Sequence, residues 1–232
     1  PDNVVLVVVG DVEPREVFAL AEKLFGGIPS RPLPLRKPQD EPPQLGVKRV
    51  TVKAPAELPY VMMTFRAPVL RDPERDWEPY ALKMLAAVLS GNESARLNRS
   101  LVREQRLASS AGADYDGIAR GPEFFYLSAT PVSGKSAADV EQGLRREMAR
   151  IIDEGVTEEE LNRVKAQAIA AEVYQRDSMF FQARVIGTLE MTGLSHRTVD
   201  LQLKKLREVT PEQVREVARK YFREDALTIA HL

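Results

Sequence analysis

The stretch from Gly91 to Asp116 constrains the fold of this chain most strongly, because it predicts a helix end, a second helix and a strand in close succession. Gly91 is expected to end a helix that starts near Trp77, since a residue without a Cβ can adopt the left-handed conformation that terminates helices. Ser94 is expected to cap the next helix, over residues 95–105. The apolar positions of that helix recur at helical spacing and are Leu97, Leu101 and Val102.

The order of the expected elements favours an α+β fold. Strand patterns occupy residues 4–9, 46–54, 60–66, 107–115, 124–131 and 227–232. Helical patterns occupy residues 14–25, 77–90, 95–105, 136–154, 157–174, 179–191, 199–206 and 211–221. Strands come first, then a long helical block, then a final strand. This order predicts an antiparallel sheet with helices packed on one face, in which segments 46–54 and 60–66 pair with each other.

Composition excludes several classes of protein. The 232 residues include 33 basic and 34 acidic ones, a net charge of −1, which provides no basic field for nucleic acid. The chain contains no cysteine, so disulfides, zinc–thiolate sites and thiol nucleophiles are excluded. The longest apolar runs, such as Val4–Val9, are far shorter than the roughly 20 residues of a membrane-spanning helix.

The first part of the chain predicts the end of a preceding domain. A β-branched run, Val4–Val9, is followed by a helix that starts at Pro14 and ends at Gly26. Residues 29–45 are a proline-rich linker, and residues 46–232 form the main domain. Because the turn and β-run at 223–230 resemble those at 1–8, we expect an internal duplication that is cut open at Pro1. The exposed run 4–9 is then expected to pair with a second copy or to lie on the surface.

One motif in the central stretch resembles a known family. The segment Gly91-Asn92-Glu93-Ser94-Ala95-Arg96-Leu97 is similar to the Gly-Gly-x-Ser-Ser-Arg-Leu segment of the pitrilysin/insulinase zinc peptidases, which include the mitochondrial processing peptidases. The resemblance implies an α+β domain from a two-lobed enzyme. In that family one half carries zinc, and the other closes the chamber and holds the peptide substrate.

The catalytic signature of that family, His-x-x-Glu-His, is absent from this chain. Its only histidines, His196 and His231, are too far apart in sequence to bind one zinc ion as neighbours on a helix. The interpretation is therefore a non-catalytic C-terminal half with no cofactor of its own. Zinc is expected in a missing N-terminal half of the parent protein or in a partner subunit.

The resemblance also implies an arginine–tyrosine pair that holds the substrate backbone from across the chamber. The arginine position is occupied by Val102 and the tyrosine position by Ser109, neither of which replaces the missing group. Arg103 and Tyr115 lie nearby and are the candidate substitutes for substrate contact. The alternative is that Arg103 is a solvated helix residue and Tyr115 packs at a strand end.

A second motif points to nucleotides. The run Ala129-Thr130-Pro131-Val132-Ser133-Gly134-Lys135-Ser136 fits a relaxed phosphate-loop pattern between a strand and a helix. Pro131 removes a backbone N–H from the loop that would bind phosphate. We therefore interpret the run as a strand-to-helix turn with Ser136 as the cap, and keep a nucleotide site at Gly134-Lys135-Ser136 as a remote alternative.

The sequence thus predicts the non-catalytic half of a zinc metallopeptidase that contacts peptide and works with a catalytic half or a homologous partner, without nucleic acid or a membrane span. The competing class is a catalytically dead scaffold protein of the same family. Resemblance to paired bacterial members implies a periplasmic location and a dimeric assembly.

Overall fold

The computed structural model describes residues 4–32, 37, 42–55 and 59–232. Its sheet has five strands in the order β1-β5-β2-β4-β3. Their bounds are β1 Lys48–Thr51, β2 Val61–Ala67, β3 Ala108–Asp114, β4 Glu123–Pro131 and β5 Leu227–His231. Every pairing is antiparallel except that of β1 with β5, which is parallel. The chain's last strand therefore lies inside the sheet, between the first two.

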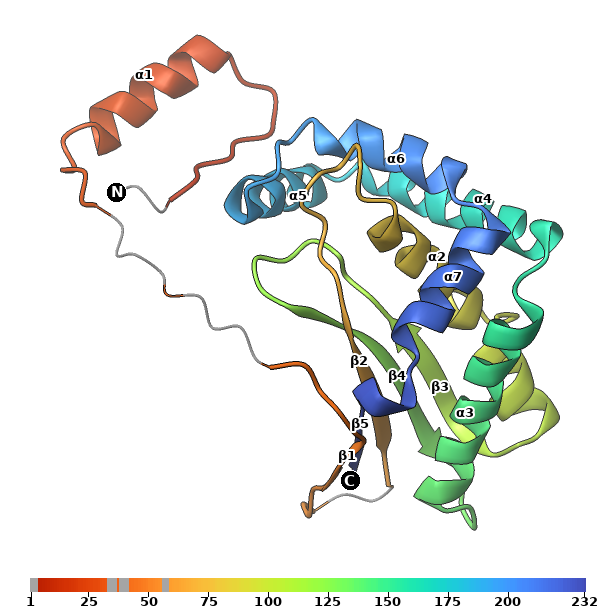
Figure 1. The fold of residues 1–232 in the computed structure, drawn as a ribbon. Helices are drawn as coiled ribbons and strands as arrows, with labels where there is room; N and C mark the ends of the chain where they lie inside the picture. The colour runs from red at the N-terminus through yellow and green to blue at the C-terminus, as the bar shows by residue number, and fades with distance from the viewer. Residues whose placement is uncertain (1–3, 33–36, 38–41, 56–58) are drawn as a thin grey trace.

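Helices cover one face of this sheet (Figure 1). α2 Glu78–Ser90, α3 Ala137–Glu154, α7 Pro211–Tyr221 and the π-helix η1 Asn98–Glu104 contact the strands. α4 Glu158–Gln175 and α6 Thr198–Glu208 pack on α2, and α5 Met179–Thr192 packs on α6. The short 3-10 helix η2 Glu224–Ala226 leads into β5. A further helix, α1 Pro14–Phe25, stands apart from the sheet and has no buried residue. The predicted α+β class, with helices packed on one face, is confirmed.

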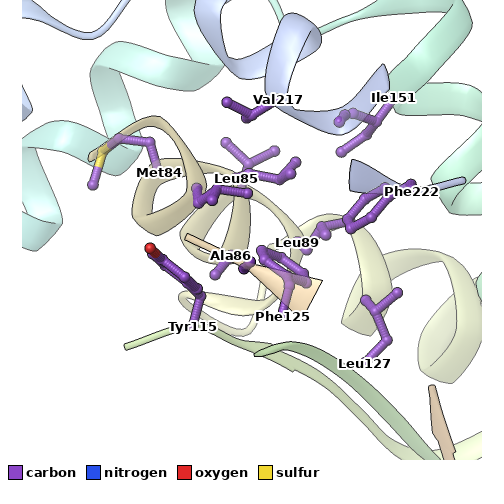
Figure 2. Close-up of a cluster of buried hydrophobic side chains, with 14 of the residues drawn as sticks. Met84, Leu85, Ala86, Leu89, Tyr115, Phe125, Leu127, Ile151, Val217 and Phe222 are labelled. Atoms are coloured by element: carbon purple, nitrogen blue, oxygen red, sulfur yellow. The ribbon is translucent and has the colours of Figure 1, made fainter. Parts of the chain in front are cut away.

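Strand periodicity explains where the core lies. Buried and half-buried residues alternate along β2 and β4, because successive side chains point to opposite faces. The buried side meets α2, α3 and α7 in one apolar cluster (Figure 2). In its centre Phe125 packs edge-on against Phe222, with ring centroids 5.1 Å apart, and stacks on Tyr115 at 6.2 Å.

Two strand predictions were wrong. Segment 46–54 does not pair with 60–66, because β5 inserts between β1 and β2. All four residues of β1 are exposed, as befits an edge strand without an alternating apolar face. Val4–Val9 is not a strand either. A strand needs a neighbour for its N–H and C=O groups, and none of the strands in the described part of the chain lies beside it.

Helix ends follow the predicted caps in most places. Ser136 and Asp139 form a capping box at α3, and Gly155 ends that helix with φ 75°. Gly91 ends α2, but with φ −65° it is right-handed rather than left-handed as predicted. Glycine is needed there because a Cβ would lie 2.6 Å from the Ala87 carbonyl oxygen. Ser94 does not cap the next helix, since its Oγ bonds Asn92 Oδ1 at 2.7 Å.

A buried carboxylate ties α3 to the edge of the sheet. Glu141 accepts two bonds of 2.8 Å from Arg49 on β1 and one of 2.9 Å from Arg145, and lies 3.1 Å from His231 Nε2 on β5. The pKa of Glu141 is lowered to about 2, mainly by the hydrogen bond from Arg49. Desolvation acts to raise this pKa, and the hydrogen bond from Arg145 lowers it further. The ion pair therefore helps to keep the parallel β1 strand on the sheet.

This cluster predicts a pH-dependent loss of stability. Because the pKa of Glu141 falls from 4.5 to about 2 on folding, its contribution is present above pH 4.5 and is lost as the pH drops towards 2. We expect Glu141→Gln to lower the free energy of unfolding by about 2 kcal/mol at pH 7 and by much less near pH 2.5. Urea unfolding measures both. Glu154→Gln, an exposed carboxylate on the same helix, is the control, and a pH-independent Glu141→Gln effect would contradict the assignment.

Candidate functional site

The segment that would face substrate by family resemblance is a π-helix leading into an edge strand. The Gln105 N–H bonds the Ser100 carbonyl at 2.9 Å, five residues back, which is the wider turn of a π-helix. Val102 is half-buried and packs against the core. Ser109 is exposed on β3, where a register shift interrupts the pairing with β4, and its Oγ donates to the Thr130 carbonyl at 3.2 Å. Neither position carries a cation or a phenol.

Arg96, the arginine of the family-like motif, has a structural role. Its Nε bonds Glu160 Oε1 at 2.8 Å, and one terminal nitrogen bonds Glu160 Oε2 at 2.6 Å and the Gly155 carbonyl at 2.9 Å. Both side chains are largely buried, at 8% and 16% exposure. Burial acts to raise the pKa of Glu160, but the bonds from Arg96 outweigh it, so the pKa is lowered overall. The pair fastens the start of the π-helix to the junction of α3 and α4.

A second buried acid supports the same helix. Ser100 Oγ donates to Glu147 Oε1 at 2.7 Å, and Gln105 donates to Ser100 Oγ at 2.6 Å. The π-helix is therefore held by polar bonds at Arg96 and at Ser100, and by its apolar Leu101 against the core. These contacts anchor the helix that leads into β3.

The two candidate substrate contacts are far apart. Arg103 is exposed and pairs with Glu93 at 2.9 Å. Tyr115 is buried, and its hydroxyl donates to the Pro68 carbonyl at 2.5 Å. They lie beyond opposite ends of β3, a seven-residue strand, hence on the order of 20 Å apart. The structure does not bring them together at one site.

Both histidines bond to carboxylates. His196 Nδ1 lies 3.0 Å from Glu190, whose pKa is lowered mainly by the backbone N–H of His196. His231 belongs to the Glu141 cluster. Across residues 4–32, 37, 42–55 and 59–232, no group of three or more histidine, cysteine, aspartate or glutamate side chains is arranged to hold a metal ion. None of the described helices is both long and apolar enough to cross a membrane.

The phosphate-loop pattern does not form a phosphate site. Pro131 still belongs to β4, and the backbone N–H of Val132 donates to Leu107 at 3.1 Å. The N–H of Lys135 donates back to Val132 at 3.0 Å, and that of Ser136 to Asp139 Oδ2 at 2.8 Å. A phosphate would need these N–H groups free. The predicted strand-to-helix turn with a Ser136 cap is confirmed, and the geometry argues against the nucleotide alternative.

The unit around β3 carries the family resemblance of the sequence, and comparison with known families tests that resemblance. A family described as the peptidase M16 inactive domain matches residues 1–168. The chain belongs to this family. The resemblance of Gly91–Leu97 to the pitrilysin/insulinase zinc peptidases is thereby confirmed.

Relatives and solved structures agree with this membership. An uncharacterized zinc protease of Mycobacterium leprae is 29% identical over 94% of this chain and 48% of the relative. Zinc protease PqqE of Helicobacter pylori is 25% identical over 100% of this chain and 52% of the relative. The chain thus spans about half the length of these relatives.

Two crystal structures show the same fold at lower identity. A protease from Helicobacter pylori has a TM-score of 0.87 and 21% identity, covering 97% of this chain and 54% of its own. A peptidase M16 inactive domain from Pseudomonas fluorescens has a TM-score of 0.77 and 18% identity, covering 96% and 51%.

Proposed function

We propose that this chain is the non-catalytic half of a zinc metallopeptidase. It closes the proteolytic chamber and contacts the peptide, while zinc is bound by another half of the parent or by a partner subunit. The observation that carries the proposal is the match of residues 1–168 to the inactive domain of this peptidase family. The relatives named as zinc proteases are about twice as long as this chain, which leaves room for a zinc-bearing half.

The missing arginine–tyrosine pair refines this proposal. With Val102 and Ser109 at the two positions, the donor that polarises the substrate carbonyl comes from a homologous partner. Arg103, exposed beside the π-helix, remains the candidate substitute on this chain. Tyr115 supplies at most the face of its ring, because its hydroxyl already bonds to Pro68.

The test compares the parent protein with the 232-residue chain. We expect zinc content and chelator-sensitive peptide cleavage in the parent or in a two-subunit complex, and neither in this chain alone. Cleavage by the isolated chain would overturn the proposal. A parent that binds no zinc, alone or with its partner, would favour the scaffold alternative.

We further infer that residues 1–28 complete the preceding domain, with residues 29–45 as the linker and 46–232 as the inactive domain. None of the apolar side chains of α1 is buried, and the largest are exposed, Phe18 to 73% and Leu24 to 60%. Between α1 and residues 4–6 lies an apolar cavity of about 610 Å³. Exposed apolar surface of this kind marks an interaction site.

A substitution on α1 tests whether this helix packs into a preceding domain of the parent or is a free surface helix. In the isolated chain we expect Phe18→Asp to change the free energy of unfolding by less than about 0.5 kcal/mol, because the side chain is exposed. In the parent we expect a loss of about 2 kcal/mol, because the ring would be buried there. Ala19→Asp places the same charge on the polar side of the helix and is the control. Equal effects in both proteins would contradict the domain assignment.

We also propose a location and an assembly for the parent protein. A structural neighbour from Escherichia coli is described as a periplasmic protease, with a TM-score of 0.78 and 14% identity. Together with the resemblance to paired bacterial members, this supports a periplasmic parent that works as a dimer. Cell fractionation and light scattering of the parent test the two statements.

A further inference from the structure

A cleft lies where four helices converge on the loop after β3. Its volume is about 380 Å³, which is at the lower end of the range of small-molecule sites. Its walls come from α2, α4, α5, α6 and the loop at 116–118. The apolar part of the lining includes Tyr80, Tyr115, Phe181 and Leu206.

The wall on the β3 side is preformed. Tyr115 is fixed by its bond to Pro68, and the Leu70 N–H bonds the Gly117 carbonyl at 2.8 Å. A Cβ on Gly117 would lie 2.9 Å from the Tyr115 hydroxyl and 3.3 Å from Pro79 Cβ, so the loop has no room for a larger residue there. On α2 the Tyr80 hydroxyl bonds the Pro73 carbonyl at 3.1 Å. These bonds therefore hold two walls of the cleft, the one on the β3 side and the one on α2, in place.

The cleft is lined by an amide that has no protein partner and opens onto the cleft. Gln202, on α6, is only 7% exposed and makes no hydrogen bond within the described part of the chain. An amide that opens onto a cleft without a protein partner bonds to water there, and a ligand can replace that water. A primary amide offers both a donor and an acceptor, which matches the peptide group or the carboxylate of a ligand.

Charges of both signs line the cleft and remain unpaired. Lys83 on α2 and Arg184 on α5 face the cleft together with Asp114, Asp116 and Glu172. None of the five forms an ion pair with another described residue; Arg184 only stacks over Phe181 at 5.2 Å, and Asp116 only accepts the Ile118 N–H. A phosphate would be repelled by three carboxylates, and a simple cation by the two basic groups. A ligand with both charges finds a partner for each.

We propose that this cleft binds a small zwitterion of the free amino acid or dipeptide class. The ligand carboxylate pairs with Lys83 and Arg184, its ammonium group pairs with the acidic side chains, and its polar backbone bonds to Gln202. The cleft consists wholly of residues of this chain and lies apart from Val102 and Ser109. Its ligand binding is therefore measurable whether or not the proposed peptidase function holds.

Titration of the 232-residue chain with the dipeptide alanyl-alanine tests the proposal. Calorimetry should show saturable binding at one site. The N-acetylated and the C-amidated dipeptides should each bind at least tenfold more weakly, because each lacks one charge. Absence of saturable binding, or equal binding of the capped forms, would overturn the proposal.

Variants locate the binding. Gln202→Leu should weaken binding at least tenfold without lowering Tm, since the amide has no hydrogen bond to lose in the free protein. Lys83→Ala should weaken binding at least fivefold. Lys135→Ala, which changes another exposed lysine in the turn before α3, should not. Unchanged affinity in folded Lys83→Ala and Gln202→Leu proteins would place the ligand elsewhere and refute the assignment. If Gln202→Leu fails to fold, the Lys83→Ala result decides alone.

Discussion

Replacing Arg96 by alanine is expected to lower the free energy of unfolding by about 3–5 kcal/mol, because it leaves the buried Glu160 carboxylate without its cation. Arg96 supplies three hydrogen bonds, two to Glu160 and one to the Gly155 carbonyl. Urea unfolding at pH 7 measures the loss. A buried polar group left without a partner costs more than the net gain of the bond itself.

Two further variants isolate the cause. Arg99→Ala, one turn away, removes an exposed arginine that lies 3.9 Å from Glu104, and is expected to cost less than about 0.5 kcal/mol. Arg96→Met combined with Glu160→Met removes both charges and should recover most of the stability. If the double variant were as unstable as the sum of the single ones, the pair would not be coupled and the interpretation would be wrong.

Arg96 also shows what sequence alone could not predict. The family-like motif contains it, but nothing in the spacing connects position 96 to position 160. The sequence around Glu160 gives a different prediction: Thr157-x-x-Glu160 fits a full capping box, in which the Glu160 side chain would bond the backbone at the helix start. In the structure Thr157 caps the Glu160 N–H at 3.2 Å, whereas the Glu160 side chain turns to Arg96 instead. Only the structure shows that the Glu160 side chain bonds Arg96 and does not complete the capping box.

Most elements with strong periodicity were predictable, because their burial follows their own residues. The helix at 211–221 and the strand at 124–131 illustrate this, with bounds within one residue of α7 and β4. Pairing between distant strands was not predictable, since β5 enters the sheet beside β2 from the far end of the chain. The π-helical geometry of residues 98–104 was also missed, because helical spacing does not distinguish the wider turn.

For the candidate site, the sequence predicted only which catalytic groups are missing. The lack of a His-x-x-Glu-His motif, and Val102 and Ser109 at the expected positions, were evident in the sequence. The cleft around Gln202 was not, because its walls come from helices and a loop that are remote in sequence. A glutamine in an amphipathic helix gives no sign that its amide lacks a partner.

Replacing Phe125 by alanine is expected to cost about 3–5 kcal/mol, for it removes the central ring of the core. Phe125 is fully buried on β4 and contacts Phe222 after α7 (Figure 2). The Phe222 ring in turn lies 5.0 Å from that of Phe65 on β2. The cavity would lie between the sheet and the helices, where neighbouring side chains cannot collapse completely. Urea unfolding should show a lower midpoint concentration, with little change in the dependence of the unfolding free energy on urea concentration.

The adjacent ring on the same strand provides the control. Phe124 points to the opposite, half-exposed face of β4 and contacts Tyr126 at 6.0 Å, so Phe124→Ala is expected to cost only about 1 kcal/mol. A double-mutant cycle between Phe125→Leu and Phe222→Leu should give a coupling of about 0.5–1.5 kcal/mol. Equal losses for Phe124→Ala and Phe125→Ala would mean that the helices do not define the buried face. Since β4 also holds the edge strand β3 with Ser109, that result would undermine the proposed substrate-facing surface as well.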